Sequence, residues 1–268
     1  MTETAIVGSS AFDSMAADYD AREAQNPIMR MMRKRSLAML ESTFSEGARL
    51  LDVGCGTGTE ALWLTQRKRK IFAVDPSPQM LEALSRRAAA DEVHIPTRLL
   101  HARDLMTLVD EGGEASFDGA YSSFGALNAE PSLETPLAAL SRLVRPGGRI
   151  VLSVMNRWCV AEMALLAFSG KAGRALRRVR SSVRVAVGAD FSEVTYPSWN
   201  QLKRDLRPEF RVVSVQALPF LLVPYAWPAL SSHPRVYRTV GRLDGILARR
   251  RPFAWLGDHL LVVAERRQ

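Results

Sequence analysis

Short apolar runs alternate with helix-like stretches in the first half of the chain. Five runs have the length and composition of strands, and three stretches between them resemble helices. The predicted strands are residues 49–53, 70–75, 97–102, 117–123 and 149–155, and the predicted helices are residues 59–67, 79–90 and 133–143. Strands that alternate with helices favour an α/β fold, in which helices cover both faces of a mostly parallel sheet.

The second half of the chain is less regular. Ser198 has the position of a helix N-cap, and the helix that it starts should end near Leu206. Residues 210–218 and 259–265 are predicted to be strands. Residues 219–228 contain three prolines, so we expect neither a helix nor a central strand there.

A glycine-rich segment, residues 50–59, follows the first predicted strand. Its glycines, Gly54, Gly56 and Gly58, allow a sharp turn and a close approach of the backbone to a ligand. The next helix would offer free N–H groups and a positive dipole end to an anionic group. Asp75 ends the following strand, where it could accept hydrogen bonds from ribose hydroxyls. This order of elements predicts a site for a nucleotide-containing cofactor.

Two cofactor classes use this geometry. Dinucleotide-binding folds have the spacing G-x-G-x-x-G, which admits a pyrophosphate. This chain instead has Gly54-x-Gly56-x-Gly58, preceded by Asp52. A carboxylate at that place would repel a pyrophosphate but could meet the amino group of an amino-acid moiety. A dinucleotide oxidoreductase and a tight turn without any ligand are the alternatives.

The pattern resembles the first motif of the class I S-adenosylmethionine-dependent methyltransferases, and the resemblance runs from about residue 12 to residue 155. It implies S-adenosylmethionine as the cofactor and a doubly wound, seven-stranded Rossmann-like sheet with an antiparallel last strand. We expect a single methyltransferase domain, with N-terminal helices over the cofactor (1–46) and a cofactor-binding core (47–156). Two long insertions, residues 157–196 and 219–258, would form a lid over the acceptor.

The same resemblance implies roles for individual residues. Tyr19 would cover the methionine moiety, Asp52 and the glycine loop would hold it, and Asp75 would bind the ribose. The implied cofactor-binding residues are Tyr19, Asp52, Gly54, Cys55, Gly56, Gly58, Asp75, Pro76, Met80, Arg103, Asp104, Leu105, Ser122 and Ser123.

Two residues compete for the position that faces adenine. Family members commonly carry Gly-Asp-Ala in this stretch, whereas this chain has His-Ala-Arg-Asp-Leu at residues 101–105. Either Arg103 or Asp104 fits the position. We favour Asp104, because a carboxylate can accept a hydrogen bond from the exocyclic amine of adenine.

The loop after the fourth strand faces the methyl group and the acceptor in this family. Residues 122–125 read Ser-Ser-Phe-Gly and lack the Asn/Asp-Pro-Pro-aromatic sequence of many nucleic-acid amino methyltransferases. This favours a small-molecule or lipid-like acceptor, hydrophobic or anionic, that is methylated in line through proximity and alignment. The candidate acceptor-binding residues are Phe124, Arg157, Trp158, Tyr225 and Trp227.

Candidate catalytic groups are few. A general base is needed where the acceptor must lose a proton, and His233 in the second insertion is our preferred candidate. Asn128, just past the fourth strand, could orient an acceptor atom. We expect His101 to be structural and His259 to be a packing residue, and the spacing alone indicates no His–Asp pair.

Positive charge is concentrated in the second half. The 268 residues carry a net charge of +8, but residues 1–156 hold 17 basic and 20 acidic side chains, whereas residues 157–268 hold 19 and 8. An apolar stretch at 158–168 precedes six basic residues at 171–184, a combination that suits an interfacial helix. Peripheral membrane contact, an anionic acceptor and a solvated helix face are the three interpretations of this segment.

Composition narrows the remaining classes. Two cysteines, Cys55 and Cys159, cannot form a disulfide framework, and with four histidines they favour no metal site. The N-terminus lacks a basic signal region, and no uncharged apolar run reaches about 18 residues, so we expect a cytoplasmic protein. An RNA methyltransferase that uses the basic half and a non-catalytic cofactor-binding protein remain alternatives, although we expect no nucleic-acid partner.

Overall fold

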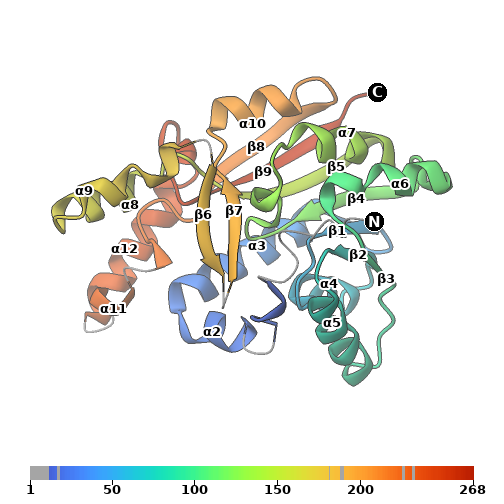
Figure 1. Ribbon diagram of the computed structural model, residues 1–268, viewed down its shortest axis with the longest axis horizontal. Helices are drawn as coiled ribbons and strands as arrows, with labels where there is room; N and C mark the ends of the chain where they lie inside the picture. The colour runs from blue at the N-terminus through green and yellow to red at the C-terminus, as the bar shows by residue number, and fades with distance from the viewer. Residues whose placement is uncertain (1–11, 17–18, 181, 188–189, 225–226, 231–232) are drawn as a thin grey trace, which may run out of the picture.

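A seven-stranded sheet forms the centre of the computed structural model, which describes residues 12–16, 19–180, 182–187, 190–224, 227–230 and 233–268 (Figure 1). The strand order is β3-β2-β1-β4-β5-β9-β8. The bounds are β1 Arg49–Val53, β2 Lys70–Asp75, β3 Thr97–Leu99, β4 Phe117–Ser122, β5 Val144–Met155, β8 Phe210–Ala217 and β9 His259–Arg266. Strands β1 to β5 are parallel, and β9 is antiparallel to β5 and β8. The predicted fold, including the antiparallel last strand, is confirmed.

Helices cover both faces of the sheet, as the alternating pattern predicted. One face packs against α3 (Pro27–Thr43), α4 (Thr59–Thr65) and α5 (Pro78–Ala90). The other face packs against α7 (Glu134–Leu143) and α10 (Trp199–Leu206). In Figure 1 the first group lies below the sheet and the second above it. Burial of apolar side chains on both faces drives this layered arrangement.

Local signals fix several element ends. Ser198 caps α10 in a reciprocal capping box: its hydroxyl accepts from the Gln201 N–H at 3.4 Å, and the Gln201 Oε1 accepts from the Ser198 N–H at 2.9 Å. Strand β5 begins at Val144 rather than at Arg149, because its pairing with β4 already starts at Val144, opposite Phe117, and resumes at Arg149, opposite Gly119, after a shift in register.

The two insertions contain regular structure. The first holds α8 (Val160–Phe168), α9 (Ala172–Ala175), a 3-10 turn (Arg177–Val179) and an antiparallel hairpin of β6 (Ser182–Val187) and β7 (Asp190–Thr195). The second holds α11 (Trp227–Leu230), α12 (Pro234–Leu247) and a 3-10 turn (Phe253–Trp255). The remaining short helices are α2 (Tyr19–Gln25) and α6 (Met106–Leu108), with 3-10 turns at Ala102–Asp104 and Ala126–Ala129 and a π-turn at Val109–Gly113. Among the described residues, no helix has the length and apolar character needed to span a membrane.

Two expectations for these insertions are corrected. The basic run at 171–184 is not one helix: it passes through α9, a 3-10 turn and β6, and Arg178 within it is buried. The interpretation as a solvated helix face therefore fails for Arg178. Trp227 and Pro228 belong to α11, although we expected no helix through residue 228; proline is tolerated in a first helical turn because its missing N–H has no partner there.

Candidate active site

The glycine loop leaves β1 through three left-handed residues. Gly54, Gly56 and Gly58 have φ values of 73°, 52° and 81°. A Cβ atom on Gly54 would lie 2.3 Å from the Cβ of Ala126, and one on Gly58 would lie 2.5 Å from Leu84, so both need glycine for packing. A Cβ on Gly56 would meet no atom within 4 Å. The loop is therefore closed against the protein on two sides and open at Gly56, where a ligand can approach the backbone.

Asp75 locks this loop from the end of β2. Its Oδ2 accepts from the Gly56 N–H at 2.8 Å, and its Oδ1 accepts from the Ser77 N–H at 2.9 Å. Burial raises the pKa of Asp75 to about 6, and the two N–H groups oppose that shift. Each carboxylate oxygen has a second lone pair, so Asp75 can still accept from ribose hydroxyls.

Asp52, in β1, is a buried carboxyl group that is only 2% exposed. Among the described residues its Oδ2 has no hydrogen-bond partner, and neither has the hydroxyl of Ser122 at the end of β4. Burial and the nearby carboxylates of Glu60 and Asp75 raise its pKa well above the ordinary range, and the Tyr121 hydroxyl opposes this shift. A buried carboxyl oxygen without a partner is costly, and a ligand ammonium beside Oδ2 would offset that cost. These groups fit the methionine end of S-adenosylmethionine.

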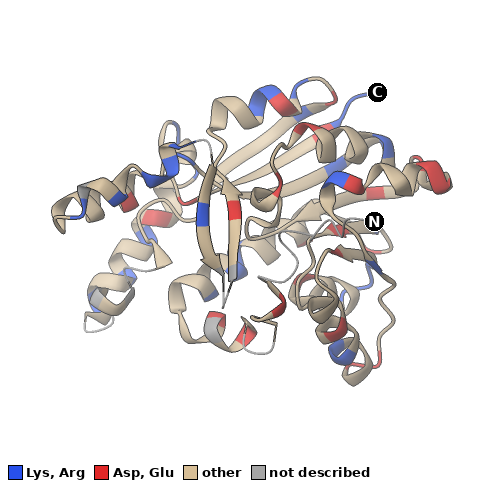
Figure 2. Cartoon of the chain, viewed as in Figure 1, with Lys and Arg blue, Asp and Glu red and all other residues tan. Residues whose placement is uncertain are grey.

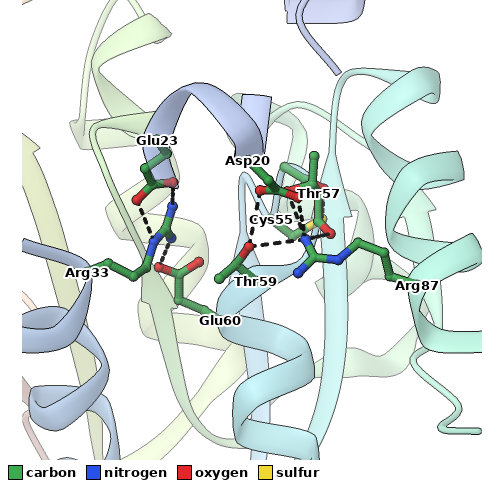
Figure 3. Close-up of polar contacts among 9 residues, drawn as sticks. Asp20, Glu23, Arg33, Cys55, Thr57, Thr59, Glu60 and Arg87 are labelled. Carbon is green, nitrogen blue, oxygen red and sulfur yellow. Dashed lines mark hydrogen bonds and ion pairs between the residues drawn. The ribbon is translucent and has the colours of Figure 1, made fainter. Parts of the chain in front are cut away.

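The N-terminal segment is tied to the glycine loop by hydrogen bonds (Figure 3). Asp20 in α2 accepts from the Thr57 hydroxyl at 2.8 Å and from Arg87 Nη1 at 2.8 Å. Asp13 accepts from the hydroxyl of Ser77. Burial raises the pKa of the neighbouring Tyr19 to about 12, so its hydroxyl stays neutral. This segment can exclude water from the loop, as the resemblance implied for Tyr19.

Arg33 of α3 is a largely buried cation that the sequence patterns did not indicate. Its guanidinium pairs with Glu60 and with Glu23, whose Oε1 lies 2.8 Å from the Arg33 Nε (Figure 3). The same guanidinium lies 4.0 Å from the ring centroid of Phe124, directly after β4. Arg33 joins the N-terminal helices to the loop that we expected to face the acceptor.

The predicted cofactor residues around adenosine differ in exposure. Met80 is a buried residue of α5, and the Cys55 thiol is buried in the glycine loop, where burial raises its pKa. Arg103 and Asp104 are both exposed in the 3-10 turn after β3, and Arg103 pairs with Glu130 at 3.4 Å. Leu105 is fully buried in the core. Pro76 and Ser123 are partly exposed at the ends of β2 and β4.

Asn128 does not have the free amide that we expected. Its Nδ2 donates to the carbonyls of Met155 at 3.0 Å and Thr195 at 2.6 Å, and its Oδ1 accepts from the Met155 N–H at 2.7 Å. The residue is buried. These bonds tie β5 to the first insertion and use both amide hydrogens of Asn128, which therefore has a structural role and no N–H left to donate to an acceptor.

The other predicted acceptor and catalytic residues are scattered. His233 is exposed, immediately before α12. Arg157 donates from Nε to the Tyr196 carbonyl at 3.0 Å, and Trp158 is exposed just before α8. Tyr225 lies outside the described residues, as does the side chain of Trp227.

One histidine that we expected to be a packing residue lies at the site. Phe124 has a left-handed φ of 51°, and its ring lies 6.3 Å from that of His259. The sequence held a signal for this position: the start of an antiparallel last strand must lie at the carboxyl edge of the parallel strands, where ligands bind.

Comparisons with known proteins agree with this geometry. Residues 50–148 match the family model of a methyltransferase domain. The chain is 33% identical over 154 residues to a malonyl-[acyl-carrier protein] O-methyltransferase of Serratia marcescens, over 58% of this chain and 54% of the relative. It is 32% identical over 112 residues to a ubiquinone biosynthesis O-methyltransferase of Alkalilimnicola ehrlichii, over 42% and 43% of the two chains. The chain thus matches about half the length of these curated relatives.

Solved structures share the fold at low sequence identity. A putative S-adenosylmethionine-dependent methyltransferase from Listeria monocytogenes aligns with a TM-score of 0.59 at 15% identity, over 87% of this chain and 97% of that one. A second such methyltransferase, from Mesorhizobium loti, aligns with a TM-score of 0.56 at 20% identity, over 87% and 96%. Residues 50–148 thus match a methyltransferase domain, and the strand order is that of the Rossmann-like fold which these solved structures share.

Proposed function

We propose that this protein transfers the methyl group of S-adenosylmethionine to a small, largely apolar acceptor. The observation that carries the proposal is the buried Asp52 carboxyl, whose Oδ2 has no hydrogen-bond partner among the described residues, in the strand that leads into the open turn at Gly56. The cofactor supplies an activated methyl group on its sulfonium, and the protein aligns the acceptor with it. Asp52 would hold the ammonium, Asp75 the ribose hydroxyls, and the segment around Tyr19 would exclude water.

Two observations support a small acceptor. The loop after β4 carries Phe124 rather than the nucleic-acid motif, and its ring is partly exposed between Arg33 and His259. Two of the relatives are named for ubiquinone biosynthesis and for demethylmenaquinone methylation, which are reactions of ring compounds. A hydroxyl-bearing aromatic ring that stacks near Phe124 is the acceptor class that we propose.

The test incubates the protein with methyl-labelled S-adenosylmethionine and a bacterial metabolite extract, followed by mass spectrometry. We expect label in a small organic product and equimolar S-adenosylhomocysteine. Label in RNA would favour the nucleic-acid alternative. Stoichiometric cofactor binding without transfer to any component would favour a non-catalytic protein, and binding of NAD instead would overturn the cofactor assignment.

Cofactor affinity should fall in acid because of Asp75. Ribose hydroxyls donate to the ionised carboxylate, so binding favours the ionised form and lowers its pKa below the value of about 6 in the free protein. The Kd of S-adenosylhomocysteine should therefore rise by up to about tenfold per pH unit below about pH 6. Calorimetric titrations at several pH values measure it; a Kd that stays constant down to about pH 5 would contradict this role.

We also propose that the insertions contact an anionic membrane surface. In α8 and the segment after it, Phe168 is 91% exposed and Leu176 is 56% exposed, and Ile246 of α12 is 55% exposed. Figure 2 shows basic residues along the same helices, which project from one end of the molecule. The exposed basic residues include Lys171, Arg174, Arg180, Arg235, Arg238 and Arg242.

No exposed acidic side chain accompanies these basic residues within residues 157–180 and 233–257. Within residues 157–180 and 233–257 the acids are Glu162 and Asp244. Both are buried, and they pair with Arg178 and Arg35 respectively. The exposed side chains of these segments are thus apolar, uncharged or cationic, which complements an anionic lipid surface. A location at the membrane would also give the protein access to an apolar acceptor.

Vesicle sedimentation tests this contact. We expect binding to vesicles of equal parts phosphatidylglycerol and phosphatidylcholine, little binding to phosphatidylcholine alone, and release at about 0.5 M salt. Phe168→Ser should weaken binding about ten- to a hundredfold, because a buried phenylalanine contributes roughly 1.5–3 kcal/mol. The matched control is Phe191→Ser, at a 52% exposed phenylalanine in β7. Equal binding of all three proteins, or binding only to RNA, would contradict the membrane proposal.

A further inference from the structure

Strand β9 brings a histidine and an aspartate to the edge of the sheet where the parallel strands end. His259, the first residue of β9, pairs with Met155, the last residue of β5. Asp258 precedes it, and its carbonyl accepts from the Asn156 N–H at 2.8 Å. Both side chains are buried. Two titratable groups therefore lie at the edge of the sheet at which cofactor and acceptor are expected.

The hydrogen bond between them determines where the imidazole proton lies. His259 Nδ1 is 2.9 Å from Asp258 Oδ2. An ionised carboxylate only accepts hydrogen bonds, so Nδ1 must carry the proton, and in the neutral ring Nε2 keeps its lone pair. Among the described residues, Nε2 has no hydrogen-bond partner and is not one of the fully enclosed polar atoms. Nε2 is thus left as a proton acceptor.

The first insertion holds Asp258 in place. Arg178 Nη2 lies 2.6 Å from Asp258 Oδ1, and Arg178 Nη1 donates to the Asp258 carbonyl at 3.2 Å. The same guanidinium pairs with Glu162 of α8. Although burial opposes ionisation, Arg178 and His259 hold the pKa of Asp258 well below its usual range. Asp258 therefore stays ionised and keeps the imidazole in one orientation.

The same cluster has the spacing of a metal site but contains an arginine instead. Ligand atoms of Cys159, Glu162 and Asp258 lie within 4.8 Å of one another. Arg178 bonds to both carboxylates and supplies the positive charge that a metal ion would bring. Burial also raises the pKa of the Cys159 thiol, which disfavours a thiolate ligand. We therefore regard the cluster as a support for Asp258.

A chain of contacts links the histidine to the cofactor loop. Gly54 packs so closely on Ala126 that a Cβ would clash at 2.3 Å. Ala126 follows Phe124 in the loop after β4, and the Phe124 ring makes an edge contact with His259. Strands β4, β5 and β9 are direct neighbours in the sheet. His259 consequently lies beside the loop that would separate the methyl group from the acceptor.

We propose that His259 is the general base of the reaction and that Asp258 is its positioning residue; this rests on the proposed methyltransferase function with a hydroxyl acceptor. The acceptor oxygen forms a bond to the methyl carbon while the carbon–sulfur bond breaks and leaves its electron pair on sulfur. The hydroxyl proton moves to Nε2, and the imidazolium is stabilised by the Asp258 carboxylate until it releases the proton to water.

The charged groups around the imidazole come from three parts of the chain. Asp258 adjoins it in sequence, Glu162 and Arg178 pack behind Asp258 from the first insertion, and Arg33 lies across Phe124. Because Glu162 and Arg178 bind each other, Asp258 is the charged group that faces the His259 imidazole directly.

Kinetics with His259→Gln test the base. The assay uses labelled S-adenosylmethionine with catechol, 3,4-dihydroxybenzoate and the extract described above. We expect His259→Gln to lower kcat about 10²- to 10⁴-fold, to remove the rise of kcat with pH, and to bind S-adenosylhomocysteine within about threefold of the unaltered protein. His94→Gln, at an exposed loop histidine, is the matched control and should retain full activity.

Asp258→Asn tests the positioning role by showing which nitrogen of the His259 ring carries the proton. In protein labelled with ¹⁵N-histidine and saturated with S-adenosylhomocysteine, we expect His259 to carry its proton on Nδ1, and this preference to be lost in Asp258→Asn. A proton on Nε2 in the unaltered protein, or kcat retained in His259→Gln, overturns the base. Absence of methyl transfer by the unaltered protein overturns the proposed function instead, and with it the reaction that the base would serve.

Discussion

Replacing Asp75 with alanine is expected to abolish measurable binding of S-adenosylmethionine and S-adenosylhomocysteine. The carboxylate would accept from ribose hydroxyls and already bonds to the N–H groups of Gly56 and Ser77. Each hydrogen bond to a charged group contributes roughly 1.5–3 kcal/mol, so losing two ribose bonds should weaken binding by at least about a hundredfold. The loss of the Gly56 bond also releases the loop that forms the cradle.

Isothermal titration calorimetry measures this effect, and thermal unfolding shows whether the variant remains folded. Asp75→Asn retains the size of the side chain and should bind more weakly than the unaltered protein but better than alanine. Asp110→Ala is the matched control, because Asp110 is an exposed aspartate outside the glycine loop. This variant should bind S-adenosylmethionine with the affinity of the unaltered protein. A Kd for Asp75→Ala within about threefold of the unaltered value would refute the assignment of the cofactor site.

Replacing Arg178 with methionine should lower the free energy of unfolding by about 3–5 kcal/mol. The guanidinium pairs with Glu162 and Asp258, and all three side chains are largely buried. Its removal leaves two carboxylates in a poorly hydrated environment, where the 3.5 Å contact of Arg177 with Glu162 is the remaining arginine pairing among the described residues. Methionine has a similar length and can fill the space of the arginine side chain. The decrease in unfolding free energy would therefore reflect mainly the missing positive charge.

The decrease in unfolding free energy that Arg178→Met causes should depend on pH. Arg178 holds the pKa of Asp258 below its unfolded value, so Asp258 stabilises the protein at neutral pH and loses that contribution as the pH falls through its folded pKa. In the variant the unpaired carboxyls would protonate more readily. The difference in unfolding free energy between the two proteins should therefore narrow in acid.

Chemical denaturation at neutral and acidic pH provides the measurement. Arg177→Met is the control, because Arg177 is 39% exposed and makes one 3.5 Å contact with Glu162. It should cost less than about 1 kcal/mol, as exposed ion pairs do. A loss below about 1 kcal/mol for Arg178→Met would mean that the cluster does not depend on this arginine.

The antiparallel direction of β9 underlies the predictions for Asp258 and His259. A parallel strand at this place would put Asp258 and His259 at the opposite edge of the sheet, away from the glycine loop. Because β9 runs against β5, its first residue pairs with the last residue of β5. The predicted direction of this strand was correct. The contact of His259 with Phe124 could not be predicted from it, because that contact also depends on how the loop after β4 folds.

Local patterns were sufficient for most of the framework. The alternation of strands and helices, the three glycines after β1 and the Ser198 cap each reflect interactions within a few residues, which a sequence displays directly. Asp75 could be assigned for the same reason, because an acidic residue at the end of the strand that follows the glycine loop occupies a fixed position in this fold.

The chemistry of single side chains depended on contacts between distant segments. Asn128 became structural because its amide meets Thr195, which is 67 residues away, and Arg178 became buried because it meets Asp258, which is 80 residues away. Local patterns were thus enough to predict the sheet, the cofactor loop and the uneven charge. Which polar groups are buried, which are already paired and which remain available depends on the folded chain, because burial and pairing arise from neighbours that no local pattern identifies.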